Sequence, residues 1–277
     1  MTKRALLIGC NNNSTPDILH MRNTLIDAYG YLDSNIYMLH DDSSFQSPTR
    51  SNILYLLTQL VAASSEDDIL WVHYIGNCPQ VQDPGLGLNI DQFAINNILK
   101  NAKCQMLLCF DSCYISSQHS LEYSMNCNGV TTVNNPNMIV DTNIAMIGWC
   151  QDSKTSSDSP DNVEKESVGA LTKTLLETLR QNDHNIALQP LYSNLCANLK
   201  MKGFAQMPVL LSSVESPVFQ FARANANGSP IVGTSTSVKK VVIPYTPKKD
   251  FILSGNNSIG TSPITIPLRG LMDNLIR

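Results

Sequence analysis

Short apolar runs alternate with longer amphipathic segments through the first 110 residues of the chain. Four of the runs have the length of buried strands, and they lie at residues 5–9, 35–40, 69–75 and 105–110. The segments between them predict helices over residues 15–29, 47–63 and 90–102. Strand-helix-strand alternation at this spacing predicts an α/β fold, a doubly wound, mostly parallel sheet with right-handed crossovers and helices on both faces.

The pattern is less regular after residue 120. Residues 121–137 are rich in Asn, Ser, Thr and Gly, and this composition predicts a long loop. The polar residues 151–162 predict a second loop. The remaining apolar positions predict two strands, at residues 143–149 and 207–212, and two helices, at residues 163–181 and 188–200.

A change of composition near residue 222 divides the chain. Residues 1–221 hold all the predicted core elements and are expected to form one domain. Residues 222–277 are enriched in Asn, Gly, Ser, Thr, Pro and Lys, which predicts an extended or partly disordered tail. Two apolar stretches of this tail, residues 238–245 and 264–268, are candidates for docking as straps, so recruitment of partners by the tail is one hypothesis.

Composition and charge exclude several classes of protein. The net charge of −4 provides no electrostatic footprint for nucleic acid or an anionic membrane. No apolar run approaches the ~20 residues of a membrane span, and the run after Arg4 is too short for a signal peptide. The eight cysteines form no C-x-x-C pair, so neither a zinc site nor a disulfide framework is indicated. We therefore expect reduced thiols in the cytosol or nucleus, and predict a cytoplasmic protein.

A polar cluster, Asp111-Ser112-Cys113, ends the fourth apolar run. A carboxylate and a thiol thus lie where a buried strand leaves the sheet, and sites in open α/β sheets form at this carboxyl edge. Cys113 is a candidate nucleophile. The alternative is a small buried hydrophobe, which is the expected state of Cys104 and Cys109 in the same strand.

Six stretches of the chain, taken in order, resemble the metacaspases, the caspase-like cysteine peptidases of plants, fungi and protists. They are KRALLIG, DDILWVHYIGN, LLCFDSCYIS, GWCQDSKTSSD, VGALTKTLLETL and FAQMPVLLSS. The resemblance covers residues 3–213 and implies a caspase-like fold, with a type I-like core that no prodomain precedes. It also implies peptide hydrolysis after Arg or Lys, in which the thiolate of Cys113 attacks the scissile carbonyl and a His transfers the proton.

The sequence departs from the family at the position of that His. The family motif is His-Tyr-Ser-Gly-His-Gly, and the corresponding stretch here is HYIGNC, residues 73–78. Asn77 replaces the catalytic His and Ile75 replaces a Ser that lines the specificity pocket. The resemblance places the oxyanion hole at backbone N–H groups near Gly76 and Cys113, which require no particular side chain.

Asn77 has no titratable nitrogen and cannot shuttle a proton near neutral pH. The first hypothesis is therefore a degenerate cysteine endopeptidase, a pseudoenzyme that keeps the fold. The alternative is an active Arg/Lys-specific endopeptidase that uses a substitute base. His73, which the family uses as a structural strand residue, and His119, six residues beyond the nucleophile, are the candidates for this base. For His119 a surface position is the competing interpretation.

The resemblance implies that two carboxylates hold the basic side chain of the substrate. One is Asp111, and the other is Asp17, which stands thirteen residues before Gly30-Tyr31. A first-turn acid that interacts with the helix dipole is the alternative for Asp17. Ile75 lies at the position of the pocket Ser, and Asp152 is a candidate for the border of the same cleft.

Cofactors and partners follow from the same comparison. Many metacaspases require calcium, but here only Asp83 and Asp91 remain as candidate ligands, so we expect no cofactor and no calcium dependence. The expected partners are peptides or proteins with basic residues, or an active homologue, and neither nucleic acid nor membrane. Extra strands at the sheet edge of metacaspases favour a monomer.

Overall fold

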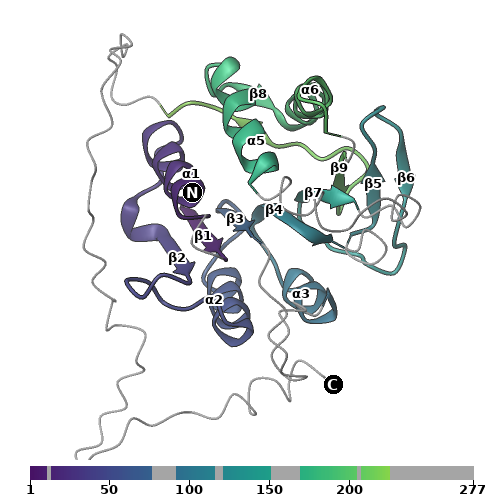
Figure 1. Cartoon of the computed structure of the whole chain (residues 1–277). Coiled ribbons are helices and arrows are strands. Elements are labelled where there is room, and N and C mark those ends of the chain that lie inside the picture. The colour runs from purple at the N-terminus through teal and green to yellow at the C-terminus, as the bar shows by residue number, and fades with distance from the viewer. Residues whose placement is uncertain (11–13, 77–91, 116–120, 151–168, 205–206, 225–277) are drawn as a thin grey trace, which may run out of the picture. The chain divides into compact units, whose positions relative to one another are not determined.

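The computed structural model describes residues 1–10, 14–76, 92–115, 121–150, 169–204 and 207–224. All of them lie within one compact unit, residues 1–238. Its centre is an eight-stranded sheet with the order β2-β1-β3-β4-β7-β9-β5-β6 (Figure 1). In chain order these strands are β1 (Lys3–Gly9), β2 (Ile36–His40), β3 (Ile69–Ile75), β4 (Gln105–Ile115), β5 (Tyr123–Met125), β6 (Thr131–Val133), β7 (Ile144–Cys150) and β9 (Pro208–Ser212).

Five neighbouring strands, β2, β1, β3, β4 and β7, run parallel to one another. β9 pairs antiparallel with β7, and the β5–β6 hairpin continues the sheet from β9. The apolar runs of β1, β3, β4 and β7 are buried on both faces, as parallel sheets require, whereas the edge strand β2 is only partly buried. This confirms the predicted doubly wound, mostly parallel α/β sheet.

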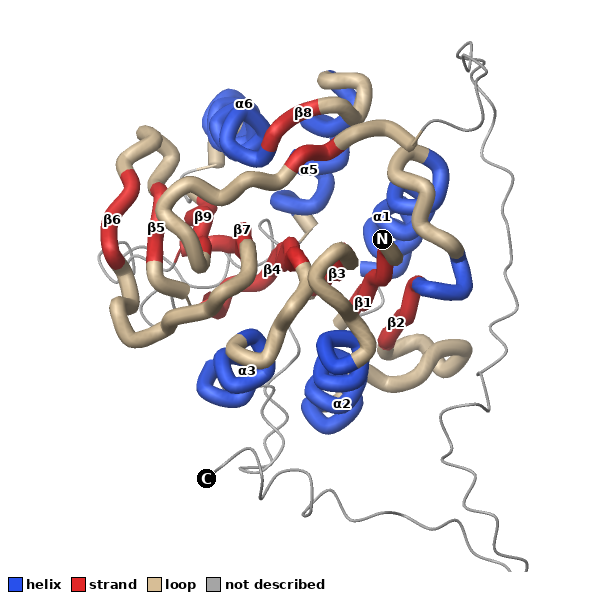
Figure 2. Tube along the Cα trace, turned by 180° about the vertical axis from the view of Figure 1, so that it is seen from behind, coloured by secondary structure: helices blue, strands red, loops and turns tan. Residues whose placement is uncertain are grey.

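Helices cover both faces of the sheet. One face carries α1 (Thr15–Asp27), α5 (Ala170–Gln181) and α6 (Leu188–Met201), and the other carries α2 (Arg50–Ala62) and α3 (Gln92–Leu99) (Figures 1 and 2). Successive strand residues point to opposite faces, so Leu7 and Trp71 pack in the first layer and Leu6 and Val72 in the second. The remaining elements are η2 (Asp33–Asn35) and the antiparallel pair β8 (Ile186–Ala187) and β10 (Gln220–Phe221).

The prediction of a loop over residues 121–137 was wrong in part, because this region contains strands β5 and β6. Each strand has only three residues, none of them buried, so no apolar run marks them in the sequence. Their backbone pairing with β9, in which Tyr123 lies opposite Ser212, places them in the sheet. Pairing with a distant strand, rather than a local pattern, therefore defines this edge.

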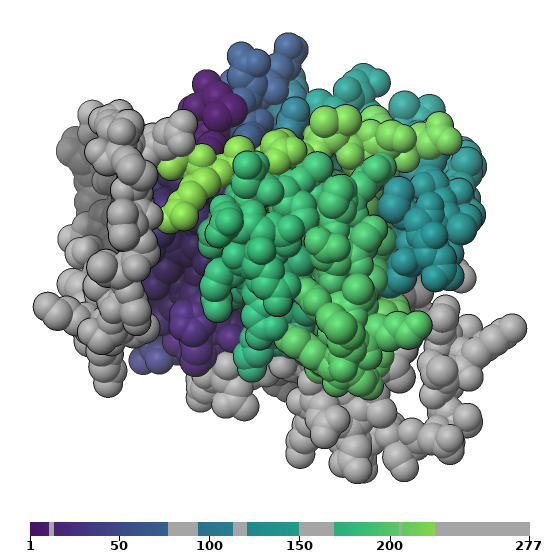
Figure 3. Space-filling model, turned by 90° about the horizontal axis from the view of Figure 1, so that it is seen from above, coloured from purple at the N-terminus to yellow at the C-terminus, as the bar shows by residue number. Residues whose placement is uncertain are grey.

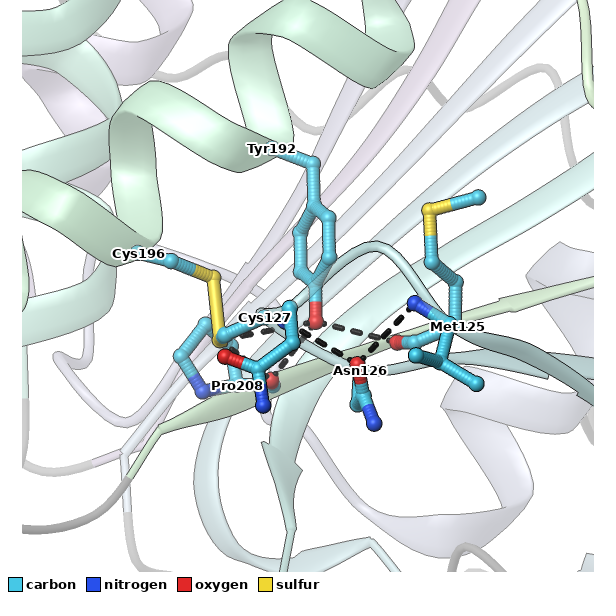
Figure 4. Close-up of a disulfide and its surroundings, with 8 residues drawn as sticks. Met125, Asn126, Cys127, Tyr192, Cys196 and Pro208 are labelled. Carbon is cyan, nitrogen blue, oxygen red and sulfur yellow. Dashed lines mark hydrogen bonds between the residues drawn. A yellow bond between two sulfur atoms is a disulfide. The ribbon is translucent and has the colours of Figure 1, made fainter.

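The expectation of reduced thiols is contradicted at three cysteines of the described residues, since Cys10, Cys127 and Cys196 are all disulfide-bonded. A disulfide joins Cys127, just after β5, to Cys196 on α6, with a Cα–Cα distance of 5.8 Å (Figure 4). The hydroxyl of Tyr192 reinforces this junction, lying 3.0 Å from the carbonyl oxygen of Met125 and 2.9 Å from that of Pro208 (Figure 4). The two cysteines are separated by 69 residues and belong to no motif, so the sequence pattern does not reveal their pairing. Reducing compartments rarely preserve such bonds, and the cytoplasmic location stays a prediction.

Two other expectations concern the buried cysteines and membrane-spanning segments. Cys104 and Cys109 are free and buried, which confirms that they are small core hydrophobes. Within the part of the chain that the structure describes, no helix is both long and apolar enough to cross a bilayer. Of the predicted tail, only residues 222–224 lie in the described ranges.

Candidate active site

The two motifs that carry the expected chemistry meet at the carboxyl edge of the sheet. Ile75, the last residue of β3, pairs with Asp111 in β4 and with Gly9 in β1. Beyond this row, the Gly76 N–H donates to the Asp111 carbonyl oxygen at 3.1 Å. The topology therefore brings the chain after β3 against the Asp-Ser-Cys turn, as the sequence predicts.

Gly76 is required by the backbone at this point. Its φ is +121°, and a Cβ would lie 1.9 Å from the carbonyl oxygen of Cys10. No L-residue with a side chain fits there without moving the backbone. The Gly76 N–H already donates to the Asp111 carbonyl oxygen, so it is not free to donate to an oxyanion. The oxyanion role expected near Gly76 stays a prediction, and this hydrogen bond argues against it.

The backbone of Cys113 lies in β4, two residues beyond Asp111. The pairing of β4 with β7 shifts its register between Phe110 and Ile115, so Asp111-Ser112-Cys113 continue β4 but interrupt its ladder with β7. Such irregularities re-aim side chains at sheet edges. Asn77, Asp152 and His119 lie outside the described residues, and their expected roles stay predictions.

Asp111 forms the buried floor of the site. Its carboxylate has no exposed surface, and its Oδ1 accepts from the Trp149 indole Nε1 at 3.0 Å while its Oδ2 accepts from the Thr172 backbone N–H at 2.7 Å. Thr172 is in the first turn of α5, so Asp111 acts as an N-terminal cap supplied by a distant strand. Burial raises the pKa of Asp111, and the hydrogen bonds from Thr172 and Trp149 oppose this effect.

Asp17 lies at the first turn of α1 and faces the same end of α5. It is 6% exposed, and its Oδ2 would lie 2.7 Å from a Cβ placed on Gly169, the residue that precedes α5. The Lys173 ammonium lies 3.7 Å from the same oxygen. Burial raises the pKa of Asp17, and the positive charge of Lys173 counteracts part of that increase. The structure thus brings both predicted pocket carboxylates to the amino end of α5.

Ile75, at the position of the pocket Ser, has no exposed surface and packs within the core layer that contains α1 and α5. It therefore contributes apolar packing, and it adds no hydrogen-bonding group near the two carboxylates.

Three side chains that the sequence reasoning did not single out belong to this site. Trp149 and Thr172 donate hydrogen bonds to the Asp111 carboxylate, and Lys173 lies beside the Asp17 carboxylate. All three fall inside the quoted stretches GWCQDSKTSSD and VGALTKTLLETL. Their position in stretches that resemble the family was the one signal the sequence offered. The partner that each of them contacts depends on how α5 packs against β4.

Two histidines lie near the carboxyl edge, and both are engaged by neighbouring residues. His73 is completely buried, its Nε2 lies 3.0 Å from the Thr172 hydroxyl, and burial lowers its pKa to about 3. His40 is also buried, with its Nδ1 accepting from the Asp42 N–H at 2.9 Å and its Nε2 3.0 Å from the Thr15 hydroxyl. A fully buried, neutral imidazole agrees with the structural interpretation of His73.

Among the described residues, no cluster of three or more His, Cys, Asp or Glu side chains is positioned to hold a metal ion. Asp83 and Asp91, the candidate calcium ligands, lie outside these residues, so calcium independence stays a prediction.

Comparisons with known proteins agree with the resemblance seen in the sequence. Residues 3–100 match the family described as "Metacaspase, peptidase C14 domain". The chain is 42% identical over 86 residues to Metacaspase-6 of Arabidopsis thaliana, a match that covers 28% of this chain and 23% of that protein. It is 29% identical over 209 residues to Metacaspase-1 of Candida albicans, covering 63% of this chain and 45% of that protein. The matches thus span less than half the length of these relatives.

Solved structures align with the chain at low sequence identity. Protein GSU0716 from Geobacter sulfurreducens aligns with a TM-score of 0.47 and 15% identity, over 78% of this chain and 95% of that chain. Caspase-1 from Spodoptera frugiperda aligns with a TM-score of 0.39 and 11% identity, over 81% of this chain and 91% of that chain.

Proposed function

We propose that this chain, a relative of the metacaspases in the caspase peptidase family, is a degenerate cysteine endopeptidase that retains Cys113 and lacks a histidine base. The observation that supports this most directly is the junction at the carboxyl edge. The Gly76 N–H bonds to the Asp111 carbonyl oxygen, so the chain leaves β3 beside Asp111. In the sequence, the family's catalytic position directly follows Gly76. The residue at that position is Asn77.

The histidines of the described residues offer no replacement base. His73 and His40 are buried and hydrogen-bonded within the core, while His20 and His184 line a separate pocket between α1 and α5. Without a base, a thiol with a pKa of ~8.5 is only a few per cent thiolate at pH 7. General acid-base help is worth roughly 10²–10⁴-fold, so amide cleavage at Cys113 should be reduced by at least this factor.

The cleft retains features that suit a basic ligand. Both oxygens of Asp111 are engaged by N–H donors, whereas the neighbour of Asp17 is Lys173, whose side chain is 61% exposed. An exposed lysine is easily displaced, because surface ion pairs are worth only about 0–1 kcal/mol. We propose that Asp17 binds an Arg or Lys side chain of a peptide or protein and that Lys173 occupies this place until the ligand arrives.

Binding without turnover would suit a decoy or a regulator of an active homologue, and the first test addresses the loss of turnover. We would measure hydrolysis of fluorogenic Arg and Lys peptides by wild type, Asn77→His, and Asn77→His combined with Cys113→Ala. Asn77→Gln serves as the matched control, because it changes the side chain without adding a base. We expect a silent wild type and control, and activity in Asn77→His that disappears in the double variant.

A second measurement tests the thiol directly. Alkylation of Cys113 by iodoacetamide, followed across pH by mass spectrometry of its peptide, should require a higher pH in wild type than in Asn77→His, because an imidazolium stabilises the thiolate. Cys113-dependent peptide cleavage by wild type would overturn the proposal in favour of a substitute base, with His119 as the first candidate.

A further inference from the structure

A second pocket lies at the opposite end of α1 and α5 from the two carboxylates of the candidate active site. Its volume is about 280 Å³, and it is lined by His20, Asn23, Thr24, Asp27, Ala28, Leu176, Arg180, His184 and Arg223. On α5, Arg180 is seven residues beyond Lys173, which corresponds to roughly 10 Å along the helix axis. The arginine end of the pocket is therefore distinct from the candidate active site, although His20 on its α1 wall is close enough to lower the pKa of Asp17.

Three segments that are distant in the sequence form its walls. α1 and α5 lie next to each other, and the segment that contains β10, yellow-green in Figure 3, runs across the green and purple parts of the chain. The Ala224 N–H donates to the Ala28 carbonyl oxygen at 2.8 Å, which fixes the neighbouring Arg223 to the end of α1. The pairing of β10 with β8 fixes the same segment to the chain that follows α5.

The turn after α5 places His184 in this pocket with an uncommon backbone. Asp183 and His184 have φ values of 50° and 58°, two consecutive left-handed residues that are not glycine. The His184 ring packs edge-on against Tyr29 with a centroid distance of 5.6 Å, and its Nδ1 lies 3.3 Å from the Tyr29 hydroxyl. Consecutive left-handed residues persist only where their surroundings hold them, and they occur preferentially at functional positions.

Cationic groups converge here in a protein whose net charge is −4. Burial lowers the pKa of His184, and the charges of Arg223 and Arg180 add to this effect, while Asp183 opposes it. Within the described residues, neither arginine forms an ion pair with a carboxylate, although Asp27 lines the same pocket. Two unpaired guanidinium groups beside two imidazoles favour an anion, since Arg presents a planar fork that matches phosphate and carboxylate oxygens.

We propose that this pocket binds a small phosphate ester, with the phosphate held by Arg180, Arg223 and His184. A phosphate dianion matches the two guanidinium charges better than a single carboxylate does. The volume lies near the lower limit of small-molecule sites, which favours an ester of a few carbon atoms over a nucleotide. Thr24 and Asp27 on α1 also line the pocket, where they can hydrogen-bond a hydroxyl or ammonium group of the ester.

The test uses the full chain and two probes, inorganic phosphate and phosphoethanolamine, with acetate as the carboxylate comparison, all at constant ionic strength. Imidazole signals in NMR spectra report the location of binding. We expect saturable shifts of His184 and His20 with both phosphate probes, tighter binding of phosphoethanolamine because of Asp27, and no shift of His40 or His73. Weak or absent shifts with acetate would distinguish the phosphate from a general anion effect.

Variants make the assignment specific. Arg180→Ala and Arg223→Ala, both exposed positions, should each weaken phosphate binding about tenfold or more, as expected for a lost charged hydrogen bond. Lys103→Ala removes an exposed cation elsewhere and should leave the affinity unchanged. Asp27→Asn should strengthen binding of inorganic phosphate, a gain that a misfolded variant cannot produce. Equal shifts in the arginine and Lys103 variants, or no saturable shift with either phosphate probe, would overturn the proposal.

Discussion

The two ends of the central sheet hold buried carboxylates in opposite electrostatic settings. At the amino end, Asp68 accepts from the Thr2 backbone N–H at 2.5 Å and from the Arg4 guanidinium at 2.8 Å, which joins the starts of β1 and β3. These contacts hold the pKa of Asp68 well below its usual range. At the carboxyl end, Asp111 is held by uncharged N–H donors, and burial raises its pKa.

The difference indicates which end is available for a ligand. A carboxylate with its own arginine is internally neutralised and stabilises the fold. At the carboxyl end, burial raises the pKa of both Asp111 and Asp17; Asp111 is held by N–H donors, and the ion pair of Asp17 is with the exposed Lys173. Carboxylates that the fold leaves incompletely neutralised favour the approach of a cation, which is a common property of binding sites.

The largest effect should come from Asp111→Ala. This change leaves the Trp149 indole N–H and the Thr172 backbone N–H unpaired in the core, and we expect a loss of about 3 kcal/mol in the free energy of unfolding. Urea unfolding followed by tryptophan fluorescence measures it. Asp111→Asn keeps one acceptor oxygen and should cost less. A loss below about 1 kcal/mol in the alanine variant would contradict the capping role of Asp111.

An intermediate effect, with a distinctive pH dependence, should come from Asp68→Asn. The folded-state pKa of Asp68 is depressed, so its contribution is present above the unfolded-state pKa and is lost as pH falls through the acidic range. Wild type should therefore lose Tm more steeply than the variant as pH falls below about 4, the unfolded-state pKa of an aspartate, because the folded-state pKa of Asp68 lies lower still. Parallel Tm profiles for the two proteins would show that the pair with Arg4 contributes nothing.

The same titration distinguishes the two ends of the sheet. The folded-state pKa of Asp111 is raised, so its ionisation costs stability as pH rises from the unfolded-state pKa toward the folded-state pKa. Asp111→Asn should therefore remove a loss of stability that grows as pH rises, whereas Asp68→Asn removes a gain of stability that grows as pH rises. Thermal denaturation across pH measures both variants against wild type, and changes of the same sign would contradict the comparison.

The smallest effect on stability should come from Lys173→Ala, which removes the cation beside Asp17. We expect a change within about 0.5 kcal/mol, because the lysine is exposed, together with tighter binding of a guanidinium probe such as benzamidine. Calorimetric titration measures the affinity, with Lys200→Ala as an exposed-lysine control and Asp17→Asn as the variant that should lose binding. Unchanged benzamidine affinity in Lys173→Ala would remove the evidence that Lys173 competes for Asp17.

Much of the fold could be predicted because it follows from local patterns. Apolar runs long enough to be buried on both sides identify β1, β3 and β4, and the spacing of polar and apolar residues identifies the helices that cover them. The position of the Asp-Ser-Cys turn at the carboxyl edge follows from the same alternation, because parallel strands end on the same side of the sheet.

The remaining features depend on contacts between segments that are far apart in the chain. The β5–β6 hairpin and the Cys127–Cys196 disulfide have no local signature, since the first requires β9 as a partner and the second closes a separation of 69 residues.

The sequence alone determined the sheet and which residue types reach its carboxyl edge, because strand length, helical period and strand order are encoded over short distances. Only the tertiary structure decided how those residues are used. It assigned Asp111 to the amino end of α5, placed Lys173 beside Asp17, and brought Arg180 and Arg223 into one pocket. The physical reason is that the energy of a charge depends on its burial and on the charges and N–H groups around it, and packing sets both.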